Sequence, residues 1–404
     1  MKHTNKRMTA LATALALMIT AAGCGHSENG VPVTAMPAEG QIADSPSPAQ
    51  MTELTTTAPA YAMPGVTVIA PEYLAEISTM EPVSDPNKKI GILSLLRMDE
   101  DAYTEYRLSQ ARMYMFLIAR GLAKIPEEMV DSMRNNGIAS PLFYDTLDSM
   151  IMGLQSGELD SIGLSQSIAK YVVSRNENLE MGITVDMEKA DDFDKFIIDG
   201  ISQGYSFMMM EDRVALRDEF NRVIADMKSD GTLEKLKKAY IDDVIAGKDP
   251  EPVAFEKNSG ETIKVAITGS LPPMDFIAPD GTPAGFNTAI LAEIGKRLGK
   301  NIELLQVDSL GRAAALASGF VDVVFWTRGR ANTSMGETQG EIDAYIENTV
   351  KSNLTEQQLE VFNAVSEKLR LISYDDVVNR DVPDGTVCTQ PYFTDVGSMV
   401  RLKQ

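Results

Sequence analysis

Residues 263–328 constrain the fold of this 404-residue chain more than any other stretch. The apolar, β-branched run 263–268 predicts a strand that is covered on both faces of a mostly parallel sheet. We expect Asn287 to cap the helix that follows and Gly299 to end it. Further helix and strand patterns are found at 302–307 (strand), 309–317 (helix) and 321–325 (strand). The stretch therefore predicts a β-α-β-α-β unit.

Three blocks in this stretch have the order and nearly the spacing of one known family: LPPMDFIAPDGTPAGFN, AEIGKRLG and ALASGFVDVVF. They resemble the start of the first lobe in bacterial extracellular solute-binding proteins of family 3, the amino-acid-binding type. The resemblance implies an α/β, two-lobed periplasmic-binding-protein-like fold of type II. In that fold each lobe is a mostly parallel sheet flanked by helices, and the ligand lies in the cleft between the lobes.

Residues 1–23 have the features of a secretory signal peptide. Basic residues precede an apolar run at 10–19 that is too short to span a bilayer, and small residues then lead to Cys24. The arrangement resembles a bacterial lipobox, although Ala21 stands where that motif usually has leucine, and it implies that Cys24 is lipidated. The alternative is an ordinary secretory signal that is cleaved near Cys24.

Residues 24–85 follow. VTVIAP within 65–85 could add a strand, but residues 25–64 are rich in serine, threonine, alanine and proline and have few large apolar side chains. Such a segment buries too little surface to offset its ordering entropy, so we expect a disordered tether. A lipid anchor and a tether together predict an extracytoplasmic protein, held to a bacterial membrane at the cell surface or on a periplasmic face.

The composition argues against several classes of function. A formal net charge of -21 argues against nucleic acid as a partner. His3 and His26 both precede the folded body, which therefore has no imidazole for catalysis or metal binding. Cys388 has no second cysteine in the body, so a disulfide framework within one chain is excluded. We predict no metal, no cofactor, no catalytic residue and a monomeric protein.

Residues 86–204 predict a second lobe. The pattern L-x-S-G-x-[LV]-D-x-[IV] occurs at 154–162 and again at 316–324, and in each copy a helix ends at a glycine before an apolar strand. Two similar β-α-β-α-β lobes are the simplest interpretation of this repeat. The order of segments within 86–204 also resembles the second lobe of the same family.

The family's segments occur here in an unusual order. Residues 205–248 resemble the family's crossing strand and C-terminal helices, yet they precede a linker at 249–262 and the first lobe at 263–404. We interpret the chain as a circular permutation, which costs little when the original termini lie close together at the surface. The alternative is two incomplete modules in tandem, each of which would lack half its sheet. We expect the paired crossing strands at 205–211 and 398–403.

A polar segment at 331–384 has helical periodicity and departs from the family. Members of the family usually pass directly from this point to a turn, which Pro391-Tyr392-Phe393 of this chain resembles. Its apolar positions predict a helical hairpin packed on the first lobe. The hairpin either caps the cleft or only decorates the lobe.

Ligand sites in open α/β sheets lie beyond the carboxyl ends of the strands. In amino-acid-binding relatives an aromatic side chain in the first loop covers the ligand, and an arginine just past the third strand binds its carboxylate as a bidentate pair. The resemblance therefore implies Phe276 and Trp326 as covers and Arg328 as the anion clamp, with Arg330 second. The alternative for Arg328 is a surface ion pair.

The second lobe lacks the acidic residue that relatives place about where Ser165 stands, to pair with the ligand ammonium. Asp145 is either its replacement or part of a helix cap. The predicted ligand-binding residues are Ser94, Asp145, Ser165, Ser270, Leu271, Met274, Phe276, Trp326, Thr327 and Arg328.

Three functions fit these features. The first is a lipid-anchored binding protein that captures a small polar solute, an amino acid or related carboxylate, for the permease of an ABC importer. The second is an enzyme that resembles cyclohexadienyl dehydratases, which use a carboxylate in the cleft to abstract a proton. The third is a ligand-sensing protein that signals to a membrane partner.

Overall fold

The structure is a computed structural model that describes residues 84–93, 123–124, 138–186, 190, 198, 202–278, 280–309, 311–328, 347–348, 351–353, 356, 359 and 383–403. The predicted signal peptide, Cys24, nearly all of the tether and most of the insertion at 331–384 lie outside these residues. Within the described part of the chain, no helix is both long and apolar enough to cross a membrane.

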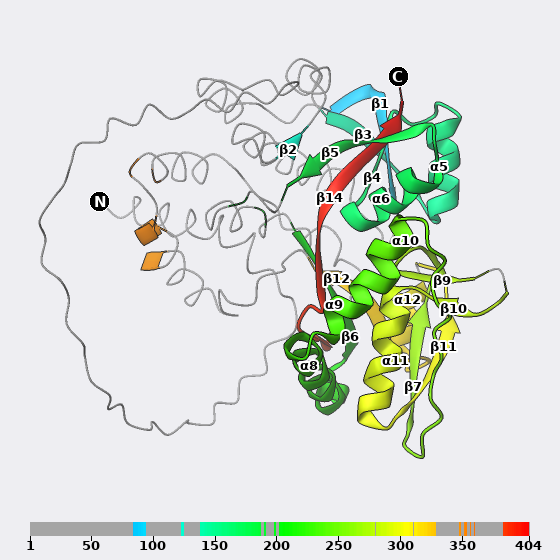
Figure 1. The fold of residues 1–404 in the computed structure, drawn as a ribbon, viewed down its shortest axis with the longest axis vertical. Coiled ribbons are helices and arrows are strands. Elements are labelled where there is room, and N and C mark those ends of the chain that lie inside the picture. The colour runs from blue at the N-terminus through cyan, green and yellow to red at the C-terminus, as the bar shows by residue number, and fades with distance from the viewer. Residues whose placement is uncertain are drawn as a thin grey trace, which may run out of the picture.

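One sheet passes through both lobes, and eleven strands of the described chain belong to it (Figure 1). The first lobe contains β6 (Ser202–Met210), β7 (Thr262–Ile267), β11 (Asn301–Gln306), β12 (Val323–Arg328) and β13 (Thr386–Cys388). The second lobe contains β1 (Ser84–Leu93), β2 (Ala123–Lys124), β3 (Ile138–Tyr144), β4 (Ser161–Ser165) and β5 (Leu179–Val185). The long strand β14 (Phe393–Leu402) runs from one lobe into the other.

Both lobes have the same strand order. In the first lobe β7 lies between β11 and β12 in parallel pairing, and antiparallel pairing then joins β12 to β6 and β6 to β13. In the second lobe β1 lies between β3 and β4 in parallel pairing, and antiparallel pairing joins β4 to β14 and β14 to β5. The predicted two-lobed α/β fold is confirmed.

The repeated sequence motif makes the same contacts in both lobes. Asp322 accepts a hydrogen bond from the backbone N–H of Lys264 at 2.9 Å, and its own N–H donates to the Lys264 carbonyl at 2.8 Å. Asp160 and Lys89 repeat this exchange at 2.7 and 2.9 Å. Each aspartate thus ties the end of a helix-to-strand turn to the lobe's first strand, so the sequence repeat is also a structural repeat.

Helices pack on the two sheet regions. The second lobe has α5 (Leu147–Gln155) and α6 (Gln166–Arg175), and the first lobe has α11 (Phe286–Leu298) and α12 (Gly311–Ala317). Three further helices, α8 (Val214–Ser229), α9 (Thr232–Lys237) and α10 (Asp243–Ile245), follow β6, with the π-helical turn η3 (Lys238–Asp242) between the last two. The apolar stripe of α8 is buried: Leu216, Phe220, Val223, Ile224 and Met227.

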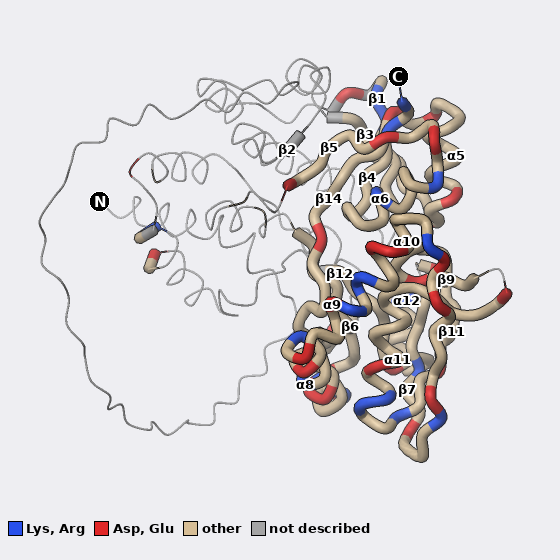
Figure 2. The backbone as a smooth tube through the Cα atoms, in the orientation of Figure 1, with Lys and Arg blue, Asp and Glu red and all other residues tan. Residues whose placement is uncertain are grey.

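Ion pairs join these helices to the first lobe. Arg297 of α11 bonds Asp230 at 2.8 Å, next to the start of α9, and Lys300 bonds Glu219 of α8 at 2.5 Å. Figure 2 shows the two signs of charge interleaved over α8 and α11 rather than gathered into a field of one sign. Residues 205–248 therefore pack on the first lobe.

The helix α11 begins differently from our expectation. Its N-cap position is Gly285, whereas Asn287 lies buried in the first turn and accepts a hydrogen bond from the Tyr392 hydroxyl at 2.9 Å. Gly285 has a φ of 109°, and a Cβ atom there would lie 2.4 Å from the Met274 carbonyl oxygen. A side chain is therefore excluded at the position that opens the helix. Gly299 ends the helix in the left-handed region, as predicted.

The crossing between the lobes also lies elsewhere than predicted. Antiparallel pairing joins β6 and β14 from Ser202 opposite Val396 to Tyr205 opposite Phe393, and from Gly397 onward β14 pairs with β4. The predicted crossing at 398–403 is therefore wrong, because that part of β14 already belongs to the second lobe. Most of 205–211 likewise lies within the first lobe, beside β12 and β13.

Candidate ligand site between the lobes

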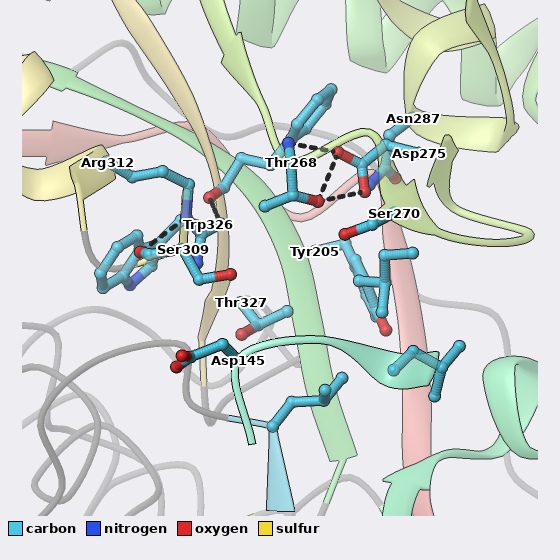
Figure 3. Close-up of a pocket in the computed structure, with 14 residues that line it drawn as sticks. Asp145, Tyr205, Thr268, Ser270, Asp275, Asn287, Ser309, Arg312, Trp326 and Thr327 are labelled. Carbon is cyan, nitrogen blue, oxygen red and sulfur yellow. Dashed lines mark hydrogen bonds between the residues drawn. The ribbon is translucent and has the colours of Figure 1, made fainter. Parts of the chain in front are cut away.

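A cavity of about 60 Å³ lies between the two lobes (Figure 3). Residues at or just past the carboxyl ends of β7, β11 and β12 line it from the first lobe, and residues at the ends of β1 and β3 line it from the second. Tyr205 of the strand β6 completes the wall. The first-lobe lining comprises Thr268, Ser270, Leu271, Asp275, Asn287, Ser309, Arg312, Phe325, Trp326 and Thr327, and the second-lobe lining comprises Leu93, Asp145 and Leu147.

A buried carboxyl group shapes the loop after β7. Asp275 is 4% exposed and accepts hydrogen bonds from the backbone N–H of Thr268 at 3.0 Å and from the Thr268 hydroxyl at 3.2 Å. Burial raises the pKa of Asp275 to about 6, although the Thr268 N–H and the positive charge of Arg312 act in the opposite direction. This carboxyl group therefore changes its charge close to neutral pH.

Arg312 is a buried cation in the cavity wall. It is 8% exposed, and its guanidinium donates to the carbonyl oxygen of Phe325 at 3.1 Å and to that of Ser309 at 3.4 Å. The same group lies over the ring of Trp326, 5.9 Å from the ring centroid. Figure 3 shows these side chains together on one side of the site, with Thr268 and Asp275 on another. Arg312 thus holds the ends of α12 and β12 together and places positive charge at the cavity.

Five of the ten predicted ligand-binding residues line the cavity: Asp145, Ser270, Leu271, Trp326 and Thr327. Asp145 lies at the second-lobe side of the site (Figure 3). It does not cap α5, because Thr146 fills that position and its hydroxyl accepts the N–H of Ser149 at 3.2 Å. The helix-cap role is therefore not met, and the role of Asp145 as a ligand-binding residue stays a prediction.

Met274 is fully buried in the core and does not line the cavity. Phe276 pairs with Ser270 and with Ala284 in a small separate sheet made by β8 (Ser270–Leu271), β9 (Asp275–Ile277) and β10 (Pro283–Ala284). That pairing, and not the cavity, determines its position, so the expectation that Phe276 covers the cavity is not met.

The remaining predictions concern residues beside the cavity or outside the described part. Ser165 is buried at the end of β4 and accepts a hydrogen bond from the Tyr205 hydroxyl at 2.8 Å. Arg328 ends β12 opposite Gly204, and its side chain lies outside the described part of the chain, as do Ser94 and Arg330. The roles of Arg328 and Arg330 as anion clamps stay predictions.

Sequence reasoning missed several lining residues, chiefly Asp275, Arg312 and Tyr205. Two of them carried a signal. Arg312 is the single charged residue in the helix GRAAALA, and Asp275 interrupts an otherwise apolar loop. A single charged residue at the start of a short apolar helix beyond the second strand indicates a residue that lines the cleft. Tyr205 carried no such signal, because its role depends on the crossing register.

The comparisons with known proteins agree with this architecture over one segment. Residues 263–333 match the family described as bacterial extracellular solute-binding proteins, family 3. The match begins in β7 and passes the end of β12, so it supports the resemblance in the first lobe. A search of curated proteins found no match.

Solved structures give weak similarities. They include the ligand-binding component of an ABC-type import system from Staphylococcus aureus (10% identity, TM-score 0.27, covering 60% of this chain and 54% of that chain). A phosphate-binding protein of a phosphate ABC transporter from Streptococcus pneumoniae TIGR4 is 9% identical, with a TM-score of 0.28 and 78% and 88% covered. The periplasmic VFT2 domain of Bordetella pertussis BvgS is 11% identical, with a TM-score of 0.26 and 82% and 83% covered.

The chain spans just over half the length of the first of these structures. Because the TM-scores are low, the strand order and the pairing between lobes carry the fold assignment.

Proposed function

We propose that this protein is an extracytoplasmic solute-binding protein that captures a small polar solute between its lobes and delivers it to the permease of an ABC importer. The observation that carries the proposal is the cavity itself. It lies at the carboxyl ends of strands from two lobes of equal topology and beside the pair of crossing strands. Rotation about such a pair opens and closes a cleft, so a solute can enter an open form and be enclosed in a closed one.

The lining favours a solute with both donor and acceptor groups, such as an amino acid or a related carboxylate. Hydroxyl groups of Thr268, Ser270, Ser309 and Thr327 can donate or accept, and Arg312 brings positive charge. A cavity of about 60 Å³ is far smaller than the roughly 300 Å³ or more of usual small-molecule pockets. The described arrangement therefore leaves little room for a solute, and the proposed function requires the lobes to move apart to admit one.

The order of elements supports the circular permutation within this proposal. The elements of the second lobe and the helices α8 to α10 come first, and the segment that matches the family starts only at residue 263. The lipid anchor rests on the sequence around Cys24. Labelling of expressing cells with a radioactive fatty acid tests it: the wild-type chain should take up label, and Cys24→Ala should not. Equal labelling of both chains contradicts the anchor.

A thermal-unfolding screen tests the binding function. The full chain is heated with a panel of amino acids, short peptides and small carboxylates. A ligand at 100 times its Kd stabilises the folded state by about 2.7 kcal/mol, which raises Tm by several degrees. Ser309→Leu should lose the shift for the same compound, and Glu219→Gln, on the outer face of α8, should keep it. A panel without any shift contradicts the proposal.

One observation favours a second candidate function, a dehydratase-like enzyme. Asp275 is a buried carboxyl group in the cleft with a pKa raised to about 6, and such a group can abstract a proton near neutral pH. A cyclohexadienyl substrate should then be consumed by the wild-type protein and not by Asp275→Asn. Absence of turnover by the wild-type protein rejects this candidate and leaves solute binding.

A further inference from the structure

We propose that Tyr205 is a closure residue, whose hydroxyl holds the two lobes together from inside the cavity. The inference deepens the proposed function and rests on it in one respect, namely that the cavity is where the solute lies. The closing contact itself is a property of the protein without any ligand.

Tyr205 is anchored in the first lobe and in the crossing. Its backbone pairs with Thr327 of β12 on one side and with Phe393 of β14 on the other. Its ring packs against that of Phe393 at a centroid distance of 5.5 Å, and the residue is 5% exposed. The side chain lines the cavity (Figure 3). The phenol is thus fixed in position before any solute arrives.

The Tyr205 hydroxyl reaches across to the second lobe. It donates to the hydroxyl oxygen of Ser165 at 2.8 Å, and both groups are buried. Ser165 occupies the N-cap position of α6, where a serine usually accepts an N–H of its own helix, yet no such bond forms here. The N–H of Ser167 donates instead to the Asp395 carboxylate of β14 at 2.8 Å. Both crossing strands therefore hold the first turn of α6.

The other end of α6 also contacts the part of the chain that packs on the first lobe. Arg175, the last residue of α6, donates to the carbonyl oxygen of Val244 in α10 at 3.1 Å. Arg175 is exposed, so this contact is weaker than the buried one at Tyr205. Together the contacts predict that α6 moves as a rigid helix, away from Tyr205 and Val244, when the lobes separate. Opening then breaks the Tyr205–Ser165 hydrogen bond.

A distance measurement between the lobes tests the inference on the full chain without ligand. Spin labels are attached at Met152→Cys in the second lobe and Phe320→Cys in the first, which are 68% and 55% exposed, with Cys24→Ser and Cys388→Ala as background. Tyr205→Phe removes only the hydroxyl. We expect the ratio of open to closed forms to rise roughly fivefold, as the loss of one buried hydrogen bond implies. Arg175→Met should shift the same ratio roughly twofold.

Tyr392→Phe is the matched control, because it also removes a buried tyrosine hydroxyl, one whose partner Asn287 belongs to the same lobe. It should lower Tm and leave the distance distribution unchanged. Ser165→Ala should reproduce the shift of Tyr205→Phe, and the double variant should add nothing further. An unchanged distribution in Tyr205→Phe, or additive shifts in the double variant, overturns the inference.

The outcome is independent of the ligand screen. A flat screen with a shifted distribution removes the proposed solute-binding function and keeps the closing contact. An active screen with an unchanged distribution removes the closing contact and keeps solute binding. For a solute found in the screen, Kd should rise in Tyr205→Phe in proportion to the fraction of closed form that is lost, because the closed form is the one that encloses the solute.

Discussion

The two lobes have the same strand order but present different chemistry to the cavity. Lys264 and Lys89 are equivalent, because each exchanges hydrogen bonds with the anchoring aspartate of its lobe. Thr268 lies four residues after Lys264, and Leu93 lies four residues after Lys89. Thr268 and Leu93 therefore occupy equivalent places at the end of the first strand. Both line the cavity. A hydroxyl group therefore faces the site from one lobe, and an isobutyl group faces it from the other.

The helices α12 and α5, which follow the strands β11 and β3 at equivalent places in the two lobes, repeat this contrast. Asp308 accepts the N–H of Gly311 at 2.5 Å to open α12, and Thr146 accepts the N–H of Ser149 at 3.2 Å to open α5. The residue after each cap lines the cavity, and it is Ser309 in the first lobe but Leu147 in the second.

Four residues after each cap, Arg312 in the first lobe corresponds to the fully buried Met150 in the second. The scaffold contacts repeat and the lining does not. The first lobe therefore supplies most of the polar groups in the described lining, and the second supplies mainly apolar ones.

The largest expected effect comes from the buried carboxyl group of the first lobe. The pKa of Asp275 is about 6 in the folded protein and near 3.8 when unfolded, so the folded state binds more protons between these values. Stability should therefore fall as pH rises from about 4 to about 6, by up to roughly 3 kcal/mol, and then level off. Urea unfolding at a series of pH values measures this.

Asp275→Asn is the matched variant, and the difference between the two curves isolates this one group. That difference matters because burial also raises the pKa of Asp395 in the crossing strand, which adds a slope of the same sign to both proteins. Parallel curves for the wild-type protein and Asp275→Asn between pH 4 and 6 contradict the assignment.

Replacing Arg312 by methionine gives the first lobe the residue that the second lobe has at this position. The buried carbonyl oxygen of Phe325 and the part-buried one of Ser309 then lose a charged donor, so we expect a loss of roughly 2 kcal/mol in the free energy of unfolding. Denaturant titration measures it. Arg217→Met is the control, since Arg217 is more exposed and reaches the Cys388 carbonyl only at 3.4 Å. Equal losses in both variants contradict a special role for Arg312.

The sequence was informative about the scaffold because the scaffold depends on local patterns. The strand at 263–268, the glycine stop at Gly299 and the apolar stripe of α8 all follow from residue type and spacing, and the structure contains them. The internal repeat could be recognised because Asp160 and Asp322 have the same task in the two lobes. Each accepts a hydrogen bond from a backbone N–H of the lobe's first strand, that of Lys89 or of Lys264.

The site was less predictable because it depends on long-range register. Whether Phe276 or Asp275 turns toward the cavity is decided by pairing within the small sheet β8 to β10. Asn287 looked like a helix cap because of its residue type, but the distant Tyr392 determines its position. The crossing was misplaced because β14 is one uninterrupted strand that changes partners without any break in its sequence.

The two anchoring aspartates provide a direct comparison of the lobes. Asp322 also bonds Arg213 at 2.5 Å, and its side chain is 17% exposed, whereas Asp160 is exposed. We expect Asp322→Ala to cost roughly 1.5 kcal/mol and Asp160→Ala roughly 0.5 kcal/mol in the free energy of unfolding. Chemical denaturation of each variant gives both values. A larger cost for Asp160→Ala reverses the ranking of the two lobes.

The smallest effect is expected from Asp145, which carries the one charge that the second lobe brings to the described lining. The residue is exposed, so water and salt screen its charge, and neutralising it in Asp145→Asn should change the affinity for a charged solute by no more than roughly fivefold. Titration of a solute from the thermal screen at low and high salt measures the change. Affinity should fall for a cationic solute and rise for an anionic one, and the difference from the wild-type protein should shrink at high salt. A change larger than that of Ser309→Leu would mean that the second lobe takes part in polar recognition as strongly as the first.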